Sequence, residues 1–395
     1  MREGWEIRKL EDCISFIKNG ANIKQSKNAA GYPITRIETL SGGKFNRDKM
    51  GYADIFELTR FSGYILNDGD VLMSHINSKA YVGRSVVYDK RDGETIIHGM
   101  NLLRIITTPE VKPKYLYLFT LSHRFKKQIA SIRKDAVNQS SVAIGDLKKL
   151  LVPVPSIAEQ EKIVAELDCL TGIIEKKKQQ LEELDKLAQS IFYDMFGDPI
   201  TNEKVWPVKL LGKVCDVRDG THDSPKYVEH SDFLLITSKN IVDGSIDFSN
   251  INYIKEEDYI AINKRSKVDD GDIIMAMIGT IGKPIIVRLE DYKFCIKNVA
   301  LIKFFSPGEV SNIYVRALLD SPAFANYIKS LNKGGTQKFV ALGTIRNLPI
   351  PVPPLDLQSE FAKKIEAIEK QKELVKRSIV ETETLFNSRM GFWFN

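Results

Sequence analysis

Cysteine is scarce in this chain, and its cysteines form no familiar motif. The four residues, Cys13, Cys169, Cys215 and Cys295, stand far apart and include no CxxC pair. This spacing argues against a zinc ribbon and a disulfide framework, and it favours a protein of the reducing cytoplasm.

Long apolar runs are also lacking. A membrane-spanning helix needs about 18–20 apolar residues, whereas the longest run here, around IIMAMI at 273–278, predicts a buried strand. The N-terminal segment MREGWEIRKL is charged and has no apolar signal core. We therefore expect a cytoplasmic protein with no membrane partner.

The common catalytic motifs are missing as well. Neither GxSxG nor HExxH occurs. GTIGK at 279–283 resembles a phosphate-binding loop, but Met277 stands where its first glycine should be and Pro284 replaces the Ser/Thr that would hold magnesium. An adenine methyltransferase needs a glycine-rich cofactor strand and an N/D-P-P-Y/F box, whereas the proline-rich runs here are PVPS and PVPP. The sequence predicts a binding protein with no catalytic residues.

Histidines are few and scattered. Of the five, only His222 and His230 share a polar loop, HDSPKYVEH, with Asp223 and Glu229. A metal site there is an alternative, but isolated loop histidines more often face solvent or contact a ligand. We therefore predict no metal site.

Positive charge is concentrated in two parts of the chain. The net charge is +6 overall. Residues 1–152 hold 25 Lys and Arg against 16 Asp and Glu, and residues 201–350 hold 20 against 18. Residues 153–200 hold 5 against 10, and residues 351–395 hold 7 of each. The basic parts favour a polyanionic partner, with an ordinary solvated surface as the alternative.

The chain contains an internal duplication. LNDGDVLMS (66–74) matches VDDGDIIMA (268–276), and MNLLRI (100–105) matches KNVALI (297–302). LVPVPSIAEQEKIVAEL (151–167) is echoed by PIPVPPLDLQSEFAKKI (349–365). Because these matches keep their order at a nearly constant offset, we predict two copies of one unit.

Each copy begins with a globular part of about 150 residues. Short β-branched runs alternate there with DG and GG turns, which predicts a mixed sheet. Helices are expected near 113–132 and near 310–331. The predicted fold class is mixed α/β or α+β, with domains at 1–152 and 199–350 and helical segments at 153–198 and 351–395.

The helical segments carry a heptad pattern. Ser156 and Glu159 form an S-x-x-E capping box before the first helix, and Asp356 is the expected N-cap of the second. Copy two has Leu357 in place of Glu159. A helix of about 50 Å is expected from the first heptad run, too long to pack on its own domain, so the two helices should pair. The expected seam residues are Ile163, Leu167, Leu170, Ile174, Leu181, Leu184, Ile191, Phe361, Ile365, Ile368, Val375, Ile379 and Phe386.

If the polyanion is DNA, loop Lys and Arg should contact phosphates, and Asn, Gln, Ser, Thr or Arg should contact base edges. Candidates in copy one are Lys24, Lys27, Arg36, Ser74, Asn77, Lys79, Tyr81, Arg84, Asn138 and Gln139. Those in copy two are Thr221, His222, Lys226, Tyr227, Thr237, Lys239, Asn240, Thr280, Lys283, Thr336, Gln337 and Lys338.

Several passages, taken in order, resemble one family. They are PVPSIAEQEKIVAELD, SIFYDMFGDPITNEKVWPVKLLGKVCDV (190–217), DGTHDSPKY (219–227), GTIGK, and GGTQK with IPVPP. The whole chain resembles the specificity (S) subunit of a type I restriction–modification system.

The resemblance implies two target recognition domains, each recognising one half of an asymmetric bipartite site in double-stranded DNA. It implies that the two helices form an antiparallel coiled coil, which sets the spacing and docks two methylation subunits. Restriction subunits would join through that complex. S-adenosylmethionine is expected on the methylation subunit, and no cofactor on this chain. The alternative from another class is a stand-alone DNA methyltransferase or nuclease with unrecognised catalytic motifs.

Overall fold

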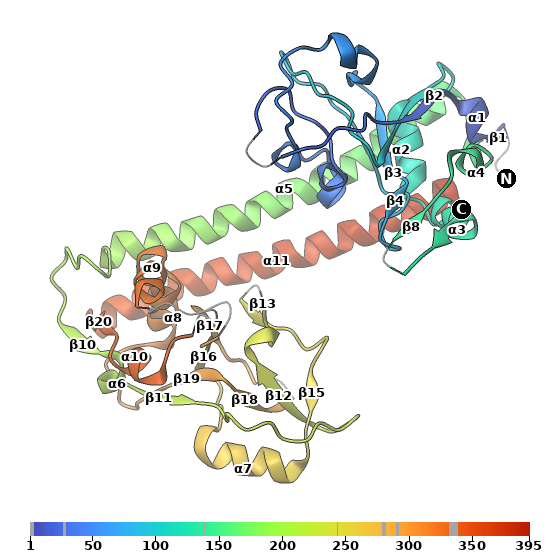
Figure 1. Cartoon of the computed structure of the whole chain (residues 1–395). Coiled ribbons are helices and arrows are strands. Elements are labelled where there is room, and N and C mark those ends of the chain that lie inside the picture. Colours follow the sequence, from blue (N-terminus) through green and yellow to red (C-terminus); the bar gives the residue numbers. More distant parts are fainter. Residues whose placement is uncertain are drawn as a thin grey trace. The chain divides into compact units, whose positions relative to one another are not determined.

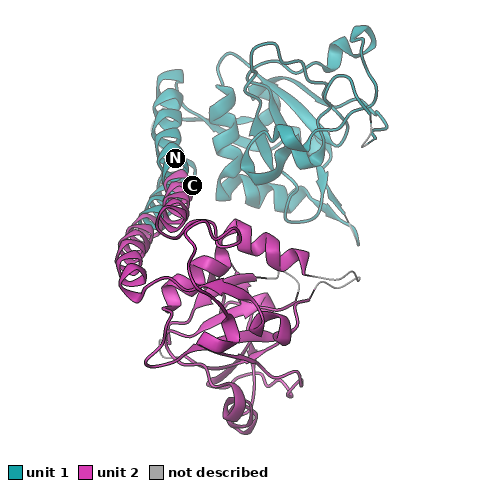
Figure 2. Cartoon of the chain, turned by 90° about the vertical axis from the view of Figure 1, so that its left-hand side faces the viewer, with its two compact units in different colours: residues 1–177, 378–395 teal, residues 178–377 magenta. Residues whose placement is uncertain are grey.

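The computed structural model describes residues 4–26, 29–137, 139–242, 244–278, 282–289, 292–331 and 339–395 (Figure 1). The chain divides into two units, which Figure 2 colours separately. Unit 1 comprises Met1–Lys177 and Ser378–Asn395, and unit 2 comprises Lys178–Arg377. Each unit is described by itself.

The β-branched runs of the first copy form an antiparallel sheet in unit 1. Its order is β2 (Ile14–Asn19), β6 (Leu102–Thr107), β3 (Val71–Ser74) and β5 (Ser85–Val87). Helices α2 (Pro113–Leu121) and α3 (His123–Ile132) follow, as the sequence predicts near 113–132. Ser122 separates them, because its hydroxyl accepts the Phe125 backbone N–H at 3.2 Å and so caps α3.

Smaller elements complete unit 1. Strands β4 (Ile76–Asn77), β8 (Ser140–Ser141) and β7 (Lys134–Asp135) form a second sheet, and β1 (Glu6–Lys9) pairs with β9 (Leu151–Val154). Short helices are α1 (Leu10–Cys13) and α4 (Ile144–Lys148), with 3₁₀ turns at Ile37–Gly43, Arg47–Lys49 and Thr59–Tyr64.

Unit 2 repeats this order. Its four-stranded antiparallel sheet is β11 (Cys215–Asp219), β19 (Val299–Phe304), β16 (Ile273–Ala276) and β17 (Gly282–Ile286). Helices α8 (Asn312–Asp320) and α9 (Pro322–Ser330) follow, and β10 (Val208–Leu210) pairs with β20 (Pro349–Pro351).

The remaining elements of unit 2 include the parallel strands. Strand β12 (Phe233–Thr237) lies between antiparallel β15 (Asn252–Tyr253) and parallel β18 (Lys293–Lys297). Strands β13 (Ile241–Val242) and β14 (Ser245–Ile246) form a hairpin. The other helices are α6 (Leu211–Val214), α7 (Glu256–Ser266), α10 (Leu342–Arg346) and a 3₁₀ turn at Ser238–Asn240.

The predicted mixed sheet needs one refinement. In both copies every strand pair of the four-stranded sheet is antiparallel. Among the strands labelled here, and within the described ranges, β12 and β18 form the parallel pair. The fold is therefore α+β in its main sheets, with a parallel strand pair in the separate three-stranded sheet of copy two.

Two long helices follow the two globular parts. Helix α5 spans Ile157–Phe196 and α11 spans Leu355–Phe394. The Ser156 hydroxyl accepts the Glu159 backbone N–H at 3.3 Å, as a capping residue should. The Glu159 carboxylate accepts the Trp5 indole N–H at 3.0 Å. The expectation that Asp356 is an N-cap is wrong: α11 already begins at Leu355, so Asp356 lies in the first turn, where its charge still favours the helix dipole.

Helices α5 and α11 run antiparallel against each other within each unit (Figure 1). In unit 1, Glu166 accepts hydrogen bonds from the Arg389 guanidinium and the Trp393 indole. In unit 2, the Lys372 ammonium lies 2.7 Å from the Asp185 carboxylate. Each helix contributes to both units, so the predicted boundaries at 152, 198 and 350 stay predictions.

The expected seam residues differ in burial. Buried members are Ile163, Leu167, Leu184, Phe361, Ile365, Ile368, Val375 and Ile379. Partly exposed members are Leu170, Ile174, Leu181, Ile191 and Phe386.

Aromatic residues at the end of each helix join the core of a globular part. In unit 2, Phe192 and Phe196 near the end of α5 pack against Tyr314 and Phe361. In unit 1, Phe394 at the end of α11 packs against Tyr115 and Phe119, with ring centroids 5.5 and 5.9 Å apart. Each core therefore contains the end of the helix that follows the other copy.

Candidate nucleic-acid interface

Two groups of predicted residues occur in unit 1. Lys24 and Arg36 are exposed on loops before β3, and Arg36 lies 3.5 Å from Glu38. The second group surrounds the edge formed by β4 and β8, where Asn77 pairs in register with Ser140. That pairing and the ion pair between Lys79 and Asp135 bring β4 and the residues just after it beside β7 and β8.

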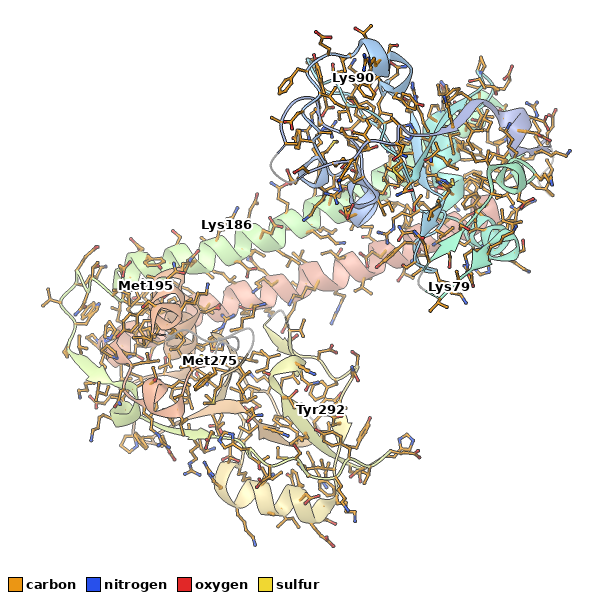
Figure 3. The ribbon with its side chains drawn as sticks, in the orientation of Figure 1. Lys79, Lys90, Lys186, Met195, Met275 and Tyr292 are labelled. Atoms are coloured by element: carbon orange, nitrogen blue, oxygen red, sulfur yellow. The ribbon has the colours of Figure 1, made fainter. Side chains whose placement is uncertain are left out.

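The β4–β8 edge carries exposed cationic and polar groups. Lys79 is exposed there (Figure 3), and its ammonium lies 3.4 Å from the Asp135 carboxylate. Arg84 lies over the ring of Tyr81 at 4.2 Å, a cation–π geometry that holds the guanidinium in place. Gln139, which precedes Ser140 of β8, is also exposed. This is a surface that can contact phosphates and base edges.

Two predicted contact residues are buried instead. Ser74 is 1% exposed, and its hydroxyl accepts the Asn77 amide at 3.2 Å. Asn240 is 5% exposed, and its amide donates to the carbonyl oxygens of Asp247 and Asn250. Both side chains support loops and cannot reach a base edge, so we remove them from the candidate interface.

In unit 2 the end of β18 gathers polar residues from three segments. Lys297 is the register partner of Thr237 in the β12–β18 pair, and Thr221 forms an isolated parallel bridge with the same lysine. The Lys297 ammonium donates to the Ser224 hydroxyl. The structure thus joins the predicted residues Thr221 and Thr237 around a lysine that the prediction did not include.

His222 is the centre of a hydrogen-bonded network beside this edge. Its Nδ1 lies 2.9 Å from Asn298 Oδ1, and its Nε2 lies 2.8 Å from Asp219 Oδ2. The other Asp219 oxygen pairs with the Arg265 guanidinium. The hydrogen bonds to Asn298 and to Asp219 raise the pKa of His222, against burial and the Arg265 charge.

The other candidates of copy two are dispersed. Lys226, Tyr227 and Lys239 are exposed on loops around β12, and Lys283 is exposed on β17. Outside the described residues lie Lys27, Asn138, Thr280, Thr336, Gln337 and Lys338.

Sequence reasoning missed Arg265, Lys297 and Asn298. Arg265 lies in the last turn of α7, where nothing in the sequence relates it to Asp219. Lys297 and Asn298 had a visible signal, because this polar pair interrupts two apolar runs, FCI and VALI. Asn298 adopts φ +54°, which an asparagine tolerates and a branched residue does not.

The chemistry of these surfaces is that of binding. Over the part of the chain that the structure describes, no group of three or more His, Cys, Asp or Glu side chains is placed to hold a metal ion. Over the same part, no helix has the length and apolar character to cross a membrane. What the edges do offer is ammonium, guanidinium, amide and hydroxyl groups, which suit phosphates and base edges.

Solved structures share this fold. The S subunit of a type I restriction–modification system from M. genitalium aligns over 98% of this chain and 95% of its own, with a TM-score of 0.55 at 14% identity. A structure concerning complex assembly and conformational transition of a type I R-M system aligns over 100% and 98%, with a TM-score of 0.59 at 16% identity.

Relatives match along most of the chain. The putative type I restriction enzyme MjaX specificity subunit of Methanocaldococcus jannaschii is 32% identical over 392 residues, covering 93% of this chain and 87% of its own length. The StySPI specificity subunit of Salmonella potsdam is 22% identical over 424 residues, covering 98% and 86%. The family model described as type I restriction modification DNA specificity domain matches twice, at residues 2–186 and 203–384. The chain therefore belongs to this family, which is the non-catalytic DNA-recognition subunit of type I restriction–modification systems.

Proposed function

We propose that this chain directs a type I restriction–modification complex to an asymmetric bipartite DNA site, with each globular domain recognising one half. The observation that carries the proposal is a duplicated scaffold with different side chains at equivalent places. The sheet orders β2-β6-β3-β5 and β11-β19-β16-β17 correspond strand for strand. Where unit 1 has Ser141 paired to Ile76, unit 2 has the exposed Phe339 paired to Ile278.

Two recognition domains on one chain gain affinity by linkage. Once one domain holds its half-site, binding by the other becomes intramolecular, and the effective concentration rises without any new contact. Different side chains in the two domains give two different half-sites. The full site is therefore long and asymmetric.

The paired helices suit a spacer between the half-sites. A helix of 40 residues, the length of both α5 and α11, extends about 60 Å at 1.5 Å per residue. One turn of B-DNA rises about 34–36 Å. We propose that the base pairs between the half-sites are spanned without being recognised.

The outer faces of the helices suit methylation subunits. Leu385 and Phe392 are 49% and 50% exposed and, being seven residues apart, lie on one face of α11. On α5 the counterpart of Leu385 is Leu187, 47% exposed, whereas Asp194 stands where α11 has Phe392. Two methylation subunits, each carrying S-adenosylmethionine, would dock on similar but unequal faces, and restriction subunits would join them in the cytoplasm.

Genomic methylation tests the whole proposal. A bipartite methylated motif should appear in cells that express this chain with its methylation subunits, and disappear when the chain is deleted. Replacing residues 1–152 by the same part of another family member should change one half of the motif. A change in both halves would refute the assignment of one domain to each half-site. Methyl transfer by the purified chain without methylation subunits would refute its non-catalytic role.

Spacer length has its own test. Seven residues inserted after Lys177 and seven after Arg377 keep both heptads in phase. They add about 10 Å of helix, or about three base pairs at about 3.4 Å per pair. The motif should keep both halves and lengthen its gap accordingly, whereas an unchanged gap would show that the helices do not set the spacing.

A further inference from the structure

His222 has oxygen acceptors at both of its ring nitrogens. Nδ1 faces Asn298 Oδ1 at 2.9 Å, and Nε2 faces Asp219 Oδ2 at 2.8 Å. A neutral imidazole carries one N–H and can donate to one of them only, whereas the imidazolium ion donates to both. The arrangement therefore fits the doubly protonated ring.

The surrounding charges come from four segments. Asp219, at the end of β11, has a side chain that is 8% exposed and that also pairs with Arg265 of α7. Lys297, at the end of β18, donates to Ser224, and Asp223 follows His222 in the loop. Arg265 disfavours a charged ring, but the acceptors at Asn298 and Asp219 outweigh it, and the pKa of His222 is raised.

The network connects the loop that begins at Thr221 and His222 to the end of β18. The Thr221 backbone N–H donates to the Ile296 carbonyl at 3.0 Å, and the Asn298 N–H donates to the Thr221 carbonyl at 3.2 Å. The ring of His222 adds the side-chain link from this loop to Asn298. Beyond it the chain continues to the exposed Lys226 and Tyr227.

Unit 1 makes the corresponding connection without an ionisable ring. Asn19 stands where unit 2 has Asp219, and its Oδ1 accepts backbone N–H groups of Gly20 and Asn101 at 3.0 and 2.9 Å. Asn22 stands at the position of His222. The nearby His98 is buried, which lowers its pKa to about 4, so this ring stays neutral near pH 7.

We propose that His222, in its doubly protonated form, is a positioning residue for the DNA-contacting loop of the second domain, and that recognition of one half-site, but not the other, weakens as pH rises through the titration of this ring. The role of His222 in DNA recognition rests on the proposed function, whereas the double protonation of its ring does not.

Nuclear magnetic resonance tests the first part without DNA. In the full chain labelled with ¹³C-histidine, the five rings are assigned by single His→Asn variants. His222 should titrate above about 6.5, the ordinary value, and Asp219→Asn should lower its midpoint. A rotated Asn298 amide that donates to a neutral ring would fit the same distances. Titration of His222 at or below the ordinary value would establish that arrangement and overturn the proposal.

DNA affinity tests the second part. With methylation subunits bound, the affinity for the full site should fall about tenfold between about pH 6 and about pH 9, the effect expected for a hydrogen bond to a charged group. His222→Asn, which installs the residue of copy one, should bind at the weaker level at every pH. His230→Asn is the matched control. His230 lies in the same loop, and its ring centroid is 6.2 Å from that of Tyr253, so the variant should leave the wild-type pH profile unchanged.

Half-site variants assign the effect to a domain. DNA altered in the half recognised by the second domain should lose the pH dependence, whereas DNA altered in the other half should keep it. Equal pH dependence with both DNAs would overturn the proposal. Absence of sequence-specific binding at every pH would refute the proposed function instead, and the resonance measurement would still decide the protonation of His222.

Discussion

Two buried glutamines, Gln160 and Gln358, join the start of each long helix to its globular domain. Both side chains are fully buried. Gln160 accepts the Lys112 N–H at 2.9 Å and donates to the carbonyl oxygens of Glu110 and Pro155 at 2.8 and 3.0 Å. Gln358 makes the same three bonds to Ser311, Glu309 and Pro353, at 2.8, 3.0 and 2.8 Å. We predict that replacing either glutamine by methionine destabilises its own unit.

The magnitude follows from the three bonds. Methionine has nearly the volume of glutamine, so the transfer and cavity contributions are small. It leaves one N–H and two carbonyl groups buried without a partner. At about 1 kcal/mol for each lost bond, the expected cost is about 2–4 kcal/mol for either Gln160→Met or Gln358→Met.

A glutamate substitution distinguishes the effect of lost hydrogen bonds from that of a change in side-chain shape. Gln358→Glu keeps the size but sets a buried carboxylate against two carbonyl oxygens, which should raise its folded-state pKa. Its folded-state pKa then exceeds the unfolded value, so the penalty is greatest at neutral pH and shrinks as pH falls through the folded-state pKa. Gln358→Met should show no such recovery.

Tryptophan fluorescence can follow each unit in urea. The three tryptophans are Trp5 and Trp393 in unit 1 and Trp206 in unit 2, where its indole donates to the Phe196 carbonyl at 3.0 Å. In a Trp206→Phe background the signal reports unit 1, and in a Trp5→Phe, Trp393→Phe background it reports unit 2. If Gln160→Met in unit 1 and Gln358→Met in unit 2 each lowered the free energy of unfolding by less than about 1 kcal/mol, the reasoning would be refuted.

Three further predictions concern the long helices. Phe394→Ala removes a core ring of unit 1 and should lower the free energy of unfolding of that unit, measured in urea, by about 3–5 kcal/mol. Phe196→Ala should produce the corresponding loss in unit 2. Equal losses in both units from one variant would contradict the division of the core. The Arg389 hydrogen bond lowers the pKa of Glu166, so its stabilisation is present at neutral pH and lost as pH falls below the ordinary value toward the folded-state pKa; thermal melting of Glu166→Gln should lack this acid-sensitive component. Lys372, 12% exposed in its side chain, interrupts the seam, and Lys372→Leu should raise the urea midpoint or leave it unchanged, whereas a loss above about 1 kcal/mol would show that the ion pair stabilises the helix pair.

The duplication, the fold class and the two long helices could be predicted because each produces a regular pattern in the sequence. The offset between matching segments stays nearly constant even where the loops differ. A heptad pattern can be recognised within one helix, before its partner helix is known. The family resemblance is confirmed by the two matches at 2–186 and 203–384. The helix pairs near 113–132 and 310–331 are confirmed as α2 with α3 and α8 with α9.

Contacts between distant segments could not be predicted in the same way. Ser74 and Asn240 have the composition of base-contacting residues, but their burial depends on which carbonyl and amide groups the fold places beside them. Arg265 reaches Asp219 across 46 residues. Pairing over such separations leaves no periodic signal in the sequence. The sequence therefore does not relate Thr221 and Thr237 to Lys297, which the fold brings together by pairing β18 with β12.

The difference between Glu159 and Leu357 looked, in the sequence, like an asymmetry between the two helix starts. The structure shows that the shared element is the glutamine that follows each of them, since Gln160 and Gln358 make the same bonds. Glu159 instead binds Trp5 of the N-terminal segment. The glutamine joints are therefore alike, whereas residues at equivalent surface positions differ: unit 2 has His222 where unit 1 has Asn22 and Phe339 where unit 1 has Ser141, and α11 has Phe392 where α5 has Asp194. Each unit keeps the same joint between its long helix and its globular part while its exposed side chains differ, which leaves each recognition domain free to bind a different sequence.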